Sequence, residues 1–472
     1  MIEGDPGAGK TTLALQFLRE GVRLGERVLY VTLSETAEEL HEVAESHGWS
    51  LDGIDLLELD ALAERLQEEA NYTVYHPADV ELGETTRRVR AEVERLNPSR
   101  VALDSVSELK ILSQTSARYR REILGLKQFF AGKQCTVLVL DDRTMSDGEQ
   151  QLQSIAHGVI RMKRETREYG DTRRQLHIVK MRGVRFRDGM HDFLIRTGGI
   201  ELYPRLRVPE SVNSSHEETI TSGVRGIDDL LGGGLDRGTS TLVMGPAGCG
   251  KTTLCSEYMM AALNRGEAVS AFLFEESCEG FLQRARGMGM DFEPHLAAGL
   301  LDLRLIDPAE LSPGEFASRV SESVERRRAR IIVIDSLNGF LNAMPSEKFL
   351  LIQMHELLMY LGKQGVVTLL VMAQHGLMGS AMTSPVDVSF LADTVILLRY
   401  FEAMGEVRQA ISVVKKRRSG HERTIRELRL GSSGVSIGEP LRDFHGVLTG
   451  VPTYRGPDAS LIARHPKKDD PA

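Results

Sequence analysis

Residues 245–253 read Gly-Pro-Ala-Gly-Cys-Gly-Lys-Thr-Thr, and residues 4–12 read Gly-Asp-Pro-Gly-Ala-Gly-Lys-Thr-Thr. Both match Gly-x4-Gly-Lys-Thr, a loop whose glycines let backbone N–H groups surround phosphates, whose lysine reaches the outer phosphates and whose threonine binds magnesium. Because the pattern occurs twice with similar continuations, the sequence predicts two sites for ATP or a related nucleotide with Mg2+. The residues assigned to nucleotide binding are Gly4, Asp5, Pro6, Gly7, Ala8, Gly9, Lys10, Thr11 and Thr12 in the first loop, and Gly245, Pro246, Ala247, Gly248, Cys249, Gly250, Lys251, Thr252 and Thr253 in the second.

The similarity of the two halves extends well beyond these loops. The same interval separates Lys10 from Glu35 and Lys251 from Glu276, and each half later has an apolar strand that ends in Asp-Ser. Solenoid repeats are only about 20–50 residues long. The repeat here takes up about half of the chain, so it indicates a duplicated domain.

Each half is expected to have the same α/β fold. Strands that alternate with helices, with a phosphate loop at a strand-to-helix turn, predict a mostly parallel sheet flanked by helices. Two shorter strands near the end of each half predict an antiparallel hairpin at the sheet edge. The expected hairpins pair residues 158–162 with 175–179, and residues 394–398 with 410–414.

The chain is expected to form two domains. The first covers residues 1–203, and the polar, Pro-containing stretch 204–216 is the linker. The second domain covers residues 217–452, and residues 453–472, rich in Pro, Asp and Lys, are expected to be a disordered tail. Because so few residues precede Gly4, we expect the first domain to lack its opening strand.

Composition narrows the class of protein. With 472 residues, 41% of them hydrophobic and 26% charged, the chain is typical of two globular domains. A net charge of −9 disfavours nucleic acid as the main partner. Four cysteines without a Cys-x-x-Cys pair indicate neither a disulfide framework nor a metal cluster. With no membrane-spanning stretch or signal peptide, the sequence predicts a cytoplasmic protein without a membrane partner.

Motifs in the second half carry a specific family resemblance. They are Ser-Gly-Val-Arg-Gly-Ile-Asp-Asp-Leu-Leu-Gly-Gly-Gly at 222–234, Glu-Glu-Ser at 275–277, and Ala-Asp-Thr-Val-Ile-Leu-Leu-Arg-Tyr at 392–400. With the two phosphate loops, they make the chain similar to the KaiC family: two-domain RecA-type ATPases that include the circadian-clock ATPase and autokinase and its non-clock bacterial relatives. The resemblance implies tandem RecA-like P-loop domains and a homo-hexameric ring with ATP at each subunit boundary.

The resemblance also implies a catalytic and a metal-binding set. Glu275 and Glu276 would orient and deprotonate the attacking water, and general-base help of this kind is worth about 10²–10⁴ in rate. Glutamates are also common at helix N-termini, where they complement the helix dipole. In the first half Ser34 stands at the position of Glu275, so only Glu35 remains and weaker hydrolysis is expected there. By the same resemblance the magnesium-binding residues are Thr11, Asp104, Thr252 and Asp335.

A basic turn ends each expected hairpin. By resemblance, its lysine and arginine reach the γ-phosphate held by the neighbouring subunit, as arginine fingers do. The alternative is a solvated basic turn without a ligand. The residues concerned are Lys180, Arg182, Lys415 and Arg417.

The resemblance also points to autophosphorylation as an activity of the chain. In the clock proteins an adjacent Ser and Thr accept phosphate, and these positions fall here on Ser389 and Phe390. Phe390 has no hydroxyl, which leaves Ser389 as the single candidate phosphoacceptor of the pair. Thr383 and Ser384 are alternatives if the segment shifts.

These patterns together indicate a KaiC-like, ring-forming and slowly hydrolysing ATPase that acts as a signalling switch. Its expected partners are copies of itself and an unidentified signalling protein. One alternative is a RecA/RadA-like DNA-dependent motor, disfavoured because no basic, aromatic-interleaved segment is present. Another is a nucleotide-gated scaffold in which ATP only assembles the ring.

Overall fold

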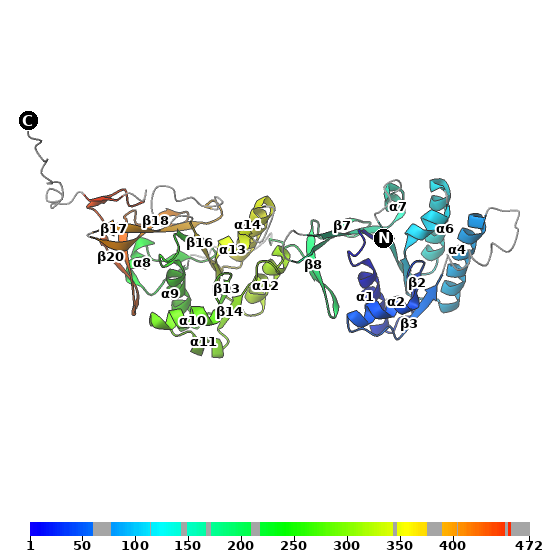
Figure 1. Ribbon diagram of the computed structural model, residues 1–472, viewed down its shortest axis with the longest axis horizontal. Coiled ribbons are helices and arrows are strands. Elements are labelled where there is room, and N and C mark those ends of the chain that lie inside the picture. Colours follow the sequence, from blue (N-terminus) through cyan, green and yellow to red (C-terminus); the bar gives the residue numbers. More distant parts are fainter. Residues whose placement is uncertain are drawn as a thin grey trace, which may run out of the picture. The chain divides into compact units, whose positions relative to one another are not determined.

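The computed structural model describes residues 1–59, 77–113, 115–142, 149–166, 171–208, 218–342, 347–374, 389–403, 405–448 and 452–454. The chain divides into two compact units, Met1–Arg205 and Leu206–Ala472. Within the described residues, each unit is built around a nine-stranded sheet with helices on both faces (Figure 1).

The sheet of the first unit has the order β3-β2-β4-β5-β1-β6-β7-β8-β9. Neighbours from β3 to β6 are parallel, and those from β6 to β9 are antiparallel. The strands are β1 Ile2–Gly4, β2 Val28–Thr32, β3 Ile54–Glu58, β4 Arg100–Asp104, β5 Thr136–Asp142, β6 Gly158–Glu165, β7 Arg173–Met181, β8 His191–Arg196 and β9 Gly199–Tyr203. The helices are α1 Lys10–Arg23, α2 Ala37–Ser46, α4 Pro77–Leu96, α5 Val106–Ser113, α6 Ser116–Ala131 and α7 Glu149–Ile155.

The second unit repeats this order as β14-β13-β15-β16-β12-β17-β18-β19-β20. Its strands are β12 Ser240–Gly245, β13 Val269–Leu273, β14 Leu301–Leu305, β15 Ile331–Asp335, β16 Val367–Ala373, β17 Thr394–Ala403, β18 Glu406–Lys416, β19 Arg426–Gly431 and β20 Gly434–Pro440. Two small pairs are added, β10 Thr219–Ile220 with β11 Leu235–Asp236 and β21 Phe444–His445 with β22 Thr453–Tyr454. Its helices are α8 Arg225–Leu230, α9 Lys251–Asn264, α10 Cys278–Gly287, α11 Glu293–Ala297, α12 Pro313–Glu325, α13 Leu337–Asn342 and α14 Glu347–Lys363.

The predicted fold class is confirmed in both halves. The hairpins β6–β7 and β17–β18 are antiparallel and longer than expected, and two further strands extend each of them. β22 lies at the start of the expected tail, so residues 453 and 454 are paired rather than disordered. The rest of that tail, and most of the expected linker, lie outside the described residues.

Burial of apolar strands between two helical layers accounts for each core. Every residue of β2 is buried, as are the first four of β15, which is typical of parallel strands covered on both faces. In the first unit, α1 and α2 pack on one face and α4, α5 and α6 on the other. In the second unit, α9 and α10 cover one face and α12, α13 and α14 the other.

The two central strands differ in length. Where the sequence predicted a missing opening strand, the three-residue β1 lies between β5 and β6, and its residues are buried. Its counterpart β12 has six residues and lies between β16 and β17. The phosphate loop of each unit therefore follows the same strand of the sheet.

Local capping sequences start the helices beside the loops. Thr36 caps α2 by accepting from the N–H of Glu39, whose side chain binds back to the N–H of Thr36. Ser277 caps α10 by accepting from the N–H of Gly280. The caps, which directly follow Glu35 in the first half and Glu276 in the second, therefore set where each helix begins.

Among the described residues, no helix combines the length and apolar character that crossing a membrane requires.

Candidate functional site

The second phosphate loop joins β12 to α9. Gly248 and Gly250 have φ of 76° and 96°, values that glycine adopts freely. A Cβ on Gly250 would also lie 2.9 Å from Leu430 Cδ1, so a side chain there would be strained and crowded. Gly250 is the N-cap of α9 and has no side chain to accept from the first N–H groups, which leaves them for an anion.

The first loop has the same geometry between β1 and α1. Gly7 and Gly9 have φ of 72° and 100°, and Gly9 is the N-cap of α1. A Cβ on Gly9 would lie 2.6 Å from Ile195 Cδ1. Both loops therefore fit phosphate groups in their backbone conformation and in their position at a helix N-terminus.

A hydroxyl and a carboxylate meet beside each loop. Thr252 Oγ1 donates to Asp335 Oδ2 at 2.5 Å, and Thr11 Oγ1 donates to Asp104 Oδ2 at 3.0 Å. Burial raises the pKa of both aspartates above the ordinary value. The structure thus brings together all four sequence-predicted metal-binding residues in two pairs. Hydroxyl and carboxylate oxygens are ligands suited to Mg2+, which usually keeps several waters and phosphate oxygens as its other ligands.

The acidic residues of the second half have polar partners. Ser336 Oγ donates to Glu275 Oε1, and Arg284 Nη2 lies 2.7 Å from Glu276 Oε2 in an ion pair. Glu275 is exposed and also raises the pKa of Asp335, which places its charge near the metal-binding pair. A carboxylate at this place could orient a water molecule beyond bound phosphates.

Glu35 of the first half has a different environment. Its Oε2 is buried without a hydrogen-bond partner among the described residues. Burial, followed by the charges of Asp104, Glu39 and Asp142, raises the pKa of Glu35 to about 7. Val43 stands where Arg284 pairs with Glu276 in the second half, so Glu35 lacks the corresponding guanidinium.

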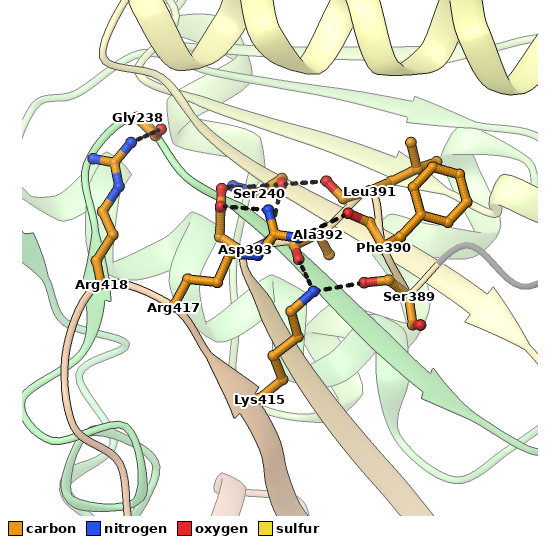
Figure 2. Close-up of polar contacts among 10 residues, drawn as sticks. All are labelled: Gly238, Ser240, Ser389, Phe390, Leu391, Ala392, Asp393, Lys415, Arg417 and Arg418. Carbon is orange, nitrogen blue, oxygen red and sulfur yellow. Dashed lines mark hydrogen bonds and ion pairs between the residues drawn. The ribbon is translucent and has the colours of Figure 1, made fainter.

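The basic residues of the second hairpin bind backbone carbonyls just before β17. Lys415 Nζ donates to the carbonyls of Ser389 and Ala392 at 2.9 and 2.8 Å, as Figure 2 shows. Arg417 donates to the carbonyl of Phe390 at 3.2 Å and lies 3.6 Å from Asp393 Oδ1. The Arg417 side chain is half exposed, at 52%.

Two of these four contacts have counterparts in the first hairpin. Lys180 Nζ donates to the carbonyl of Gln153, and Arg182 Nη2 donates to the carbonyl of Ser154 at 2.9 Å. These hydrogen bonds of the four predicted lysines and arginines run to the segment before their own hairpin. The neighbouring Lys416 and Arg418 instead donate to backbone carbonyls between residues 231 and 238, before β12.

The same contacts align Ser389 with Gln153 and Phe390 with Ser154. In Figure 2 the carbonyl of Ser389, rather than its hydroxyl, faces Lys415. The side chain of Phe390 is 51% exposed. The alternative acceptors Thr383 and Ser384 lie outside the described residues.

Three partners of the site residues were missed from the sequence. Tyr30 OH donates to Asp104 Oδ2 at 2.5 Å, and Asp142 Oδ1 lies 2.6 Å from Lys10 Nζ. The third is Arg284, the partner of Glu276. Position in the sheet could have revealed Asp142, since it ends the strand beside the loop, but nothing in the local sequence distinguishes Tyr30 from a core residue.

Comparison with known families agrees with this geometry. The sequence model of the family described as "ATPase: KaiC" matches residues 1–207 and 220–442, which include both loops and both hairpins. The chain belongs to the KaiC family of ATPases. The predicted resemblance and the tandem RecA-like fold are thereby confirmed.

Curated KaiC proteins match almost the whole chain. Circadian clock protein KaiC3 of a Synechocystis strain is 28% identical over 460 residues, which cover 96% of this chain and 90% of that protein. The circadian clock oscillator protein KaiC of Acaryochloris marina is 27% identical, with 96% and 87% covered. That of Synechococcus elongatus is also 27% identical, with the same coverage.

Among the residues that the structure describes, no group of three or more His, Cys, Asp or Glu side chains could hold a metal ion.

Proposed function

We propose that this KaiC-family ATPase binds Mg-ATP at two sites, assembles into a homo-hexameric ring, hydrolyses ATP slowly and serves as a signalling switch. The observation that carries the proposal is the repeated site. Each half has a phosphate loop with its Thr–Asp pair, and a hairpin whose lysine and arginine, among the described residues, hydrogen-bond to the segment before the hairpin and not to the phosphate loop of that half. An unidentified signalling protein would respond to the state of the ring.

Within the second site, each side chain has a distinct proposed role. Lys251 and the N-terminus of α9 bind the outer phosphates, and Thr252 with Asp335 would hold Mg2+, which supplies charge neutralisation on the phosphates. Glu275 and Glu276 orient the attacking water and accept its proton. Only Glu35 is available for this task in the first site, so we assign most turnover to the second.

The exposed arginines support assembly through ATP. A ring places Arg182 or Arg417 of one copy beside the γ-phosphate held by the next, where a guanidinium stabilises the charge of the transition state. Native mass spectrometry should show hexamers with a non-hydrolysable ATP analogue and smaller species without nucleotide. Monomers at micromolar protein and saturating nucleotide would contradict the proposal.

We also propose slow autophosphorylation of Ser389. Its Oγ would attack the γ-phosphorus of ATP bound by the neighbouring copy, ADP would leave, and Glu275 or Glu276 of that site would accept the hydroxyl proton. Intact-mass spectrometry after incubation with Mg-ATP should show one added phosphate per chain, absent in Ser389→Ala. An unmodified mass after a day would leave the ATPase proposal standing and reject the kinase activity.

A further inference from the structure

The phosphate-loop lysine of the first half is already fully engaged. Lys10 Nζ donates to the carbonyls of Gly4 and Asp5 at 3.0 and 3.1 Å, and lies 2.6 Å from Asp142 Oδ1. An ammonium group has three N–H donors, so these three acceptors occupy all of them. The Lys10 side chain is only 8% exposed, whereas that of Asp142 is 34% exposed.

The sheet register shows what stands at this place in the other half. Asp142 ends β5 and pairs with Gly4, whereas Ala373 ends β16 and pairs with Gly245 in the corresponding position. A methyl group thus replaces the carboxylate. Lys251 Nζ donates to the carbonyl of Pro246 at 2.6 Å and lies 4.0 Å from Cys249 Sγ, and within the described chain it has no ion pair.

The carboxylate of Asp142 and a bound phosphate would compete for the same donor, the ammonium group of Lys10. Asp142 binds Lys10 by a charge-assisted hydrogen bond, the kind of contact that the lysine would otherwise make to an outer phosphate. A phosphate that approaches Lys10 must displace Asp142, and the displaced carboxylate then repels it at short range. Asp142 also contributes to the raised pKa of Glu35, which shows that its charge reaches the interior of the site.

We propose that Asp142 is an internal competitor for the outer phosphates of the nucleotide and makes the first site the weaker of the two for nucleoside triphosphates. The inference rests on both loops binding phosphate, as proposed above, and adds a residue that sets their relative affinity. Ala373 leaves the second site without this competition. The difference between the two sites in affinity therefore follows from one strand-end residue in each half.

The test measures affinity rather than turnover. In full-length chains that carry Lys251→Ala, so that the second loop is disabled, binding of a fluorescent non-hydrolysable ATP analogue with Mg2+ is titrated at fixed ionic strength. Asp142→Ala and the nearly isosteric Asp142→Asn should each lower the dissociation constant about tenfold, since both remove the competing charge. Glu94→Gln, an exposed residue of α4, removes the same charge elsewhere and should leave the constant unchanged.

The reciprocal change tests the same claim in the other half. In chains that carry Lys10→Ala, Ala373→Asp should raise the dissociation constant of the second site by a similar factor. Unchanged or weaker binding in both Asp142 variants would overturn the inference, as would a complete absence of binding in every Lys251→Ala chain. Because ATP turnover by the unaltered chain is measured separately, failure of this inference is distinguishable from failure of the proposed ATPase function.

Discussion

The two halves share the strand order and register of their sheets, yet the carboxylates around their phosphate loops have different partners. In the second half Glu276 is paired with Arg284, and the strand beside the loop ends in Ala373. In the first half Glu35 has no such guanidinium, and the corresponding strand ends in Asp142, which binds the loop lysine. The duplicated fold thus keeps the place where the nucleotide would bind, while single side chains change the charges and hydrogen-bond partners around its phosphates.

Of the variants that compare the two halves, removal of an exposed hairpin arginine should change ATP turnover most. Arg417→Ala is expected to reduce ATP turnover about 10³-fold, because arginine fingers stabilise charge in the phosphoryl-transfer transition state. Arg182→Ala should reduce total turnover much less, since it serves the weaker site. The measurement is steady-state phosphate release by assembled protein, with Arg429→Ala, an exposed arginine of β19, as the control.

Mixing experiments test whether Arg417 acts on a neighbouring copy. Chains with Arg417→Ala and chains with Lys251→Ala should each be nearly inactive alone. Mixed rings contain interfaces that join an intact loop to an intact arginine, so turnover should partly recover. No recovery after mixing would indicate that Arg417 acts within its own chain or has only a structural role.

Loss of both glutamates should cause the next largest fall in ATP turnover. Glu275→Gln with Glu276→Gln is expected to lower turnover about 10²-fold, at the lower end for loss of a general base, while nucleotide binding is retained. Glu279→Gln, on the exposed surface of α10, is the matched control. If the double variant kept most of its turnover, the two glutamates would not be the base.

Much of this arrangement was predictable, for a physical reason. Phosphate loops and buried strand runs are local patterns, so the fold class and both hairpins followed from the sequence, whereas the two Thr–Asp pairs came from the family resemblance. The pairs Lys10–Asp142 and Tyr30–Asp104 join residues far apart in the chain. Such contacts depend on sheet register, which local patterns do not determine, and β1 could not be recognised from three residues.

The smallest expected effect concerns stability and pH in the first half. The pKa of Glu35 is raised from 4.5 to about 7, so in the nucleotide-free protein its ionisation favours the unfolded state. The stability that the neutral, partly buried carboxyl of Glu35 contributes is fully present below about pH 4.5 and is lost as the pH rises through 7. Glu35→Gln should therefore stabilise the protein at pH 8, on the order of 1 kcal/mol after allowing for solvent screening, and have little effect at pH 5.

Denaturant unfolding without nucleotide or Mg2+ at the two pH values checks this expectation. Glu38→Gln, an exposed neighbour at the start of α2, is the control and should show no such dependence. Equal effects of Glu35→Gln at pH 5 and pH 8 would show that the carboxyl is not held in its neutral form by the fold.

The division of labour between the halves is the central claim, and comparing two lysine variants tests it most directly. ATP turnover is measured for Lys10→Ala and Lys251→Ala under identical conditions, with nucleotide in excess and assembly monitored by native mass. The account predicts that Lys251→Ala abolishes most turnover, whereas Lys10→Ala costs less turnover and mainly weakens assembly. A larger loss of turnover in Lys10→Ala would contradict it.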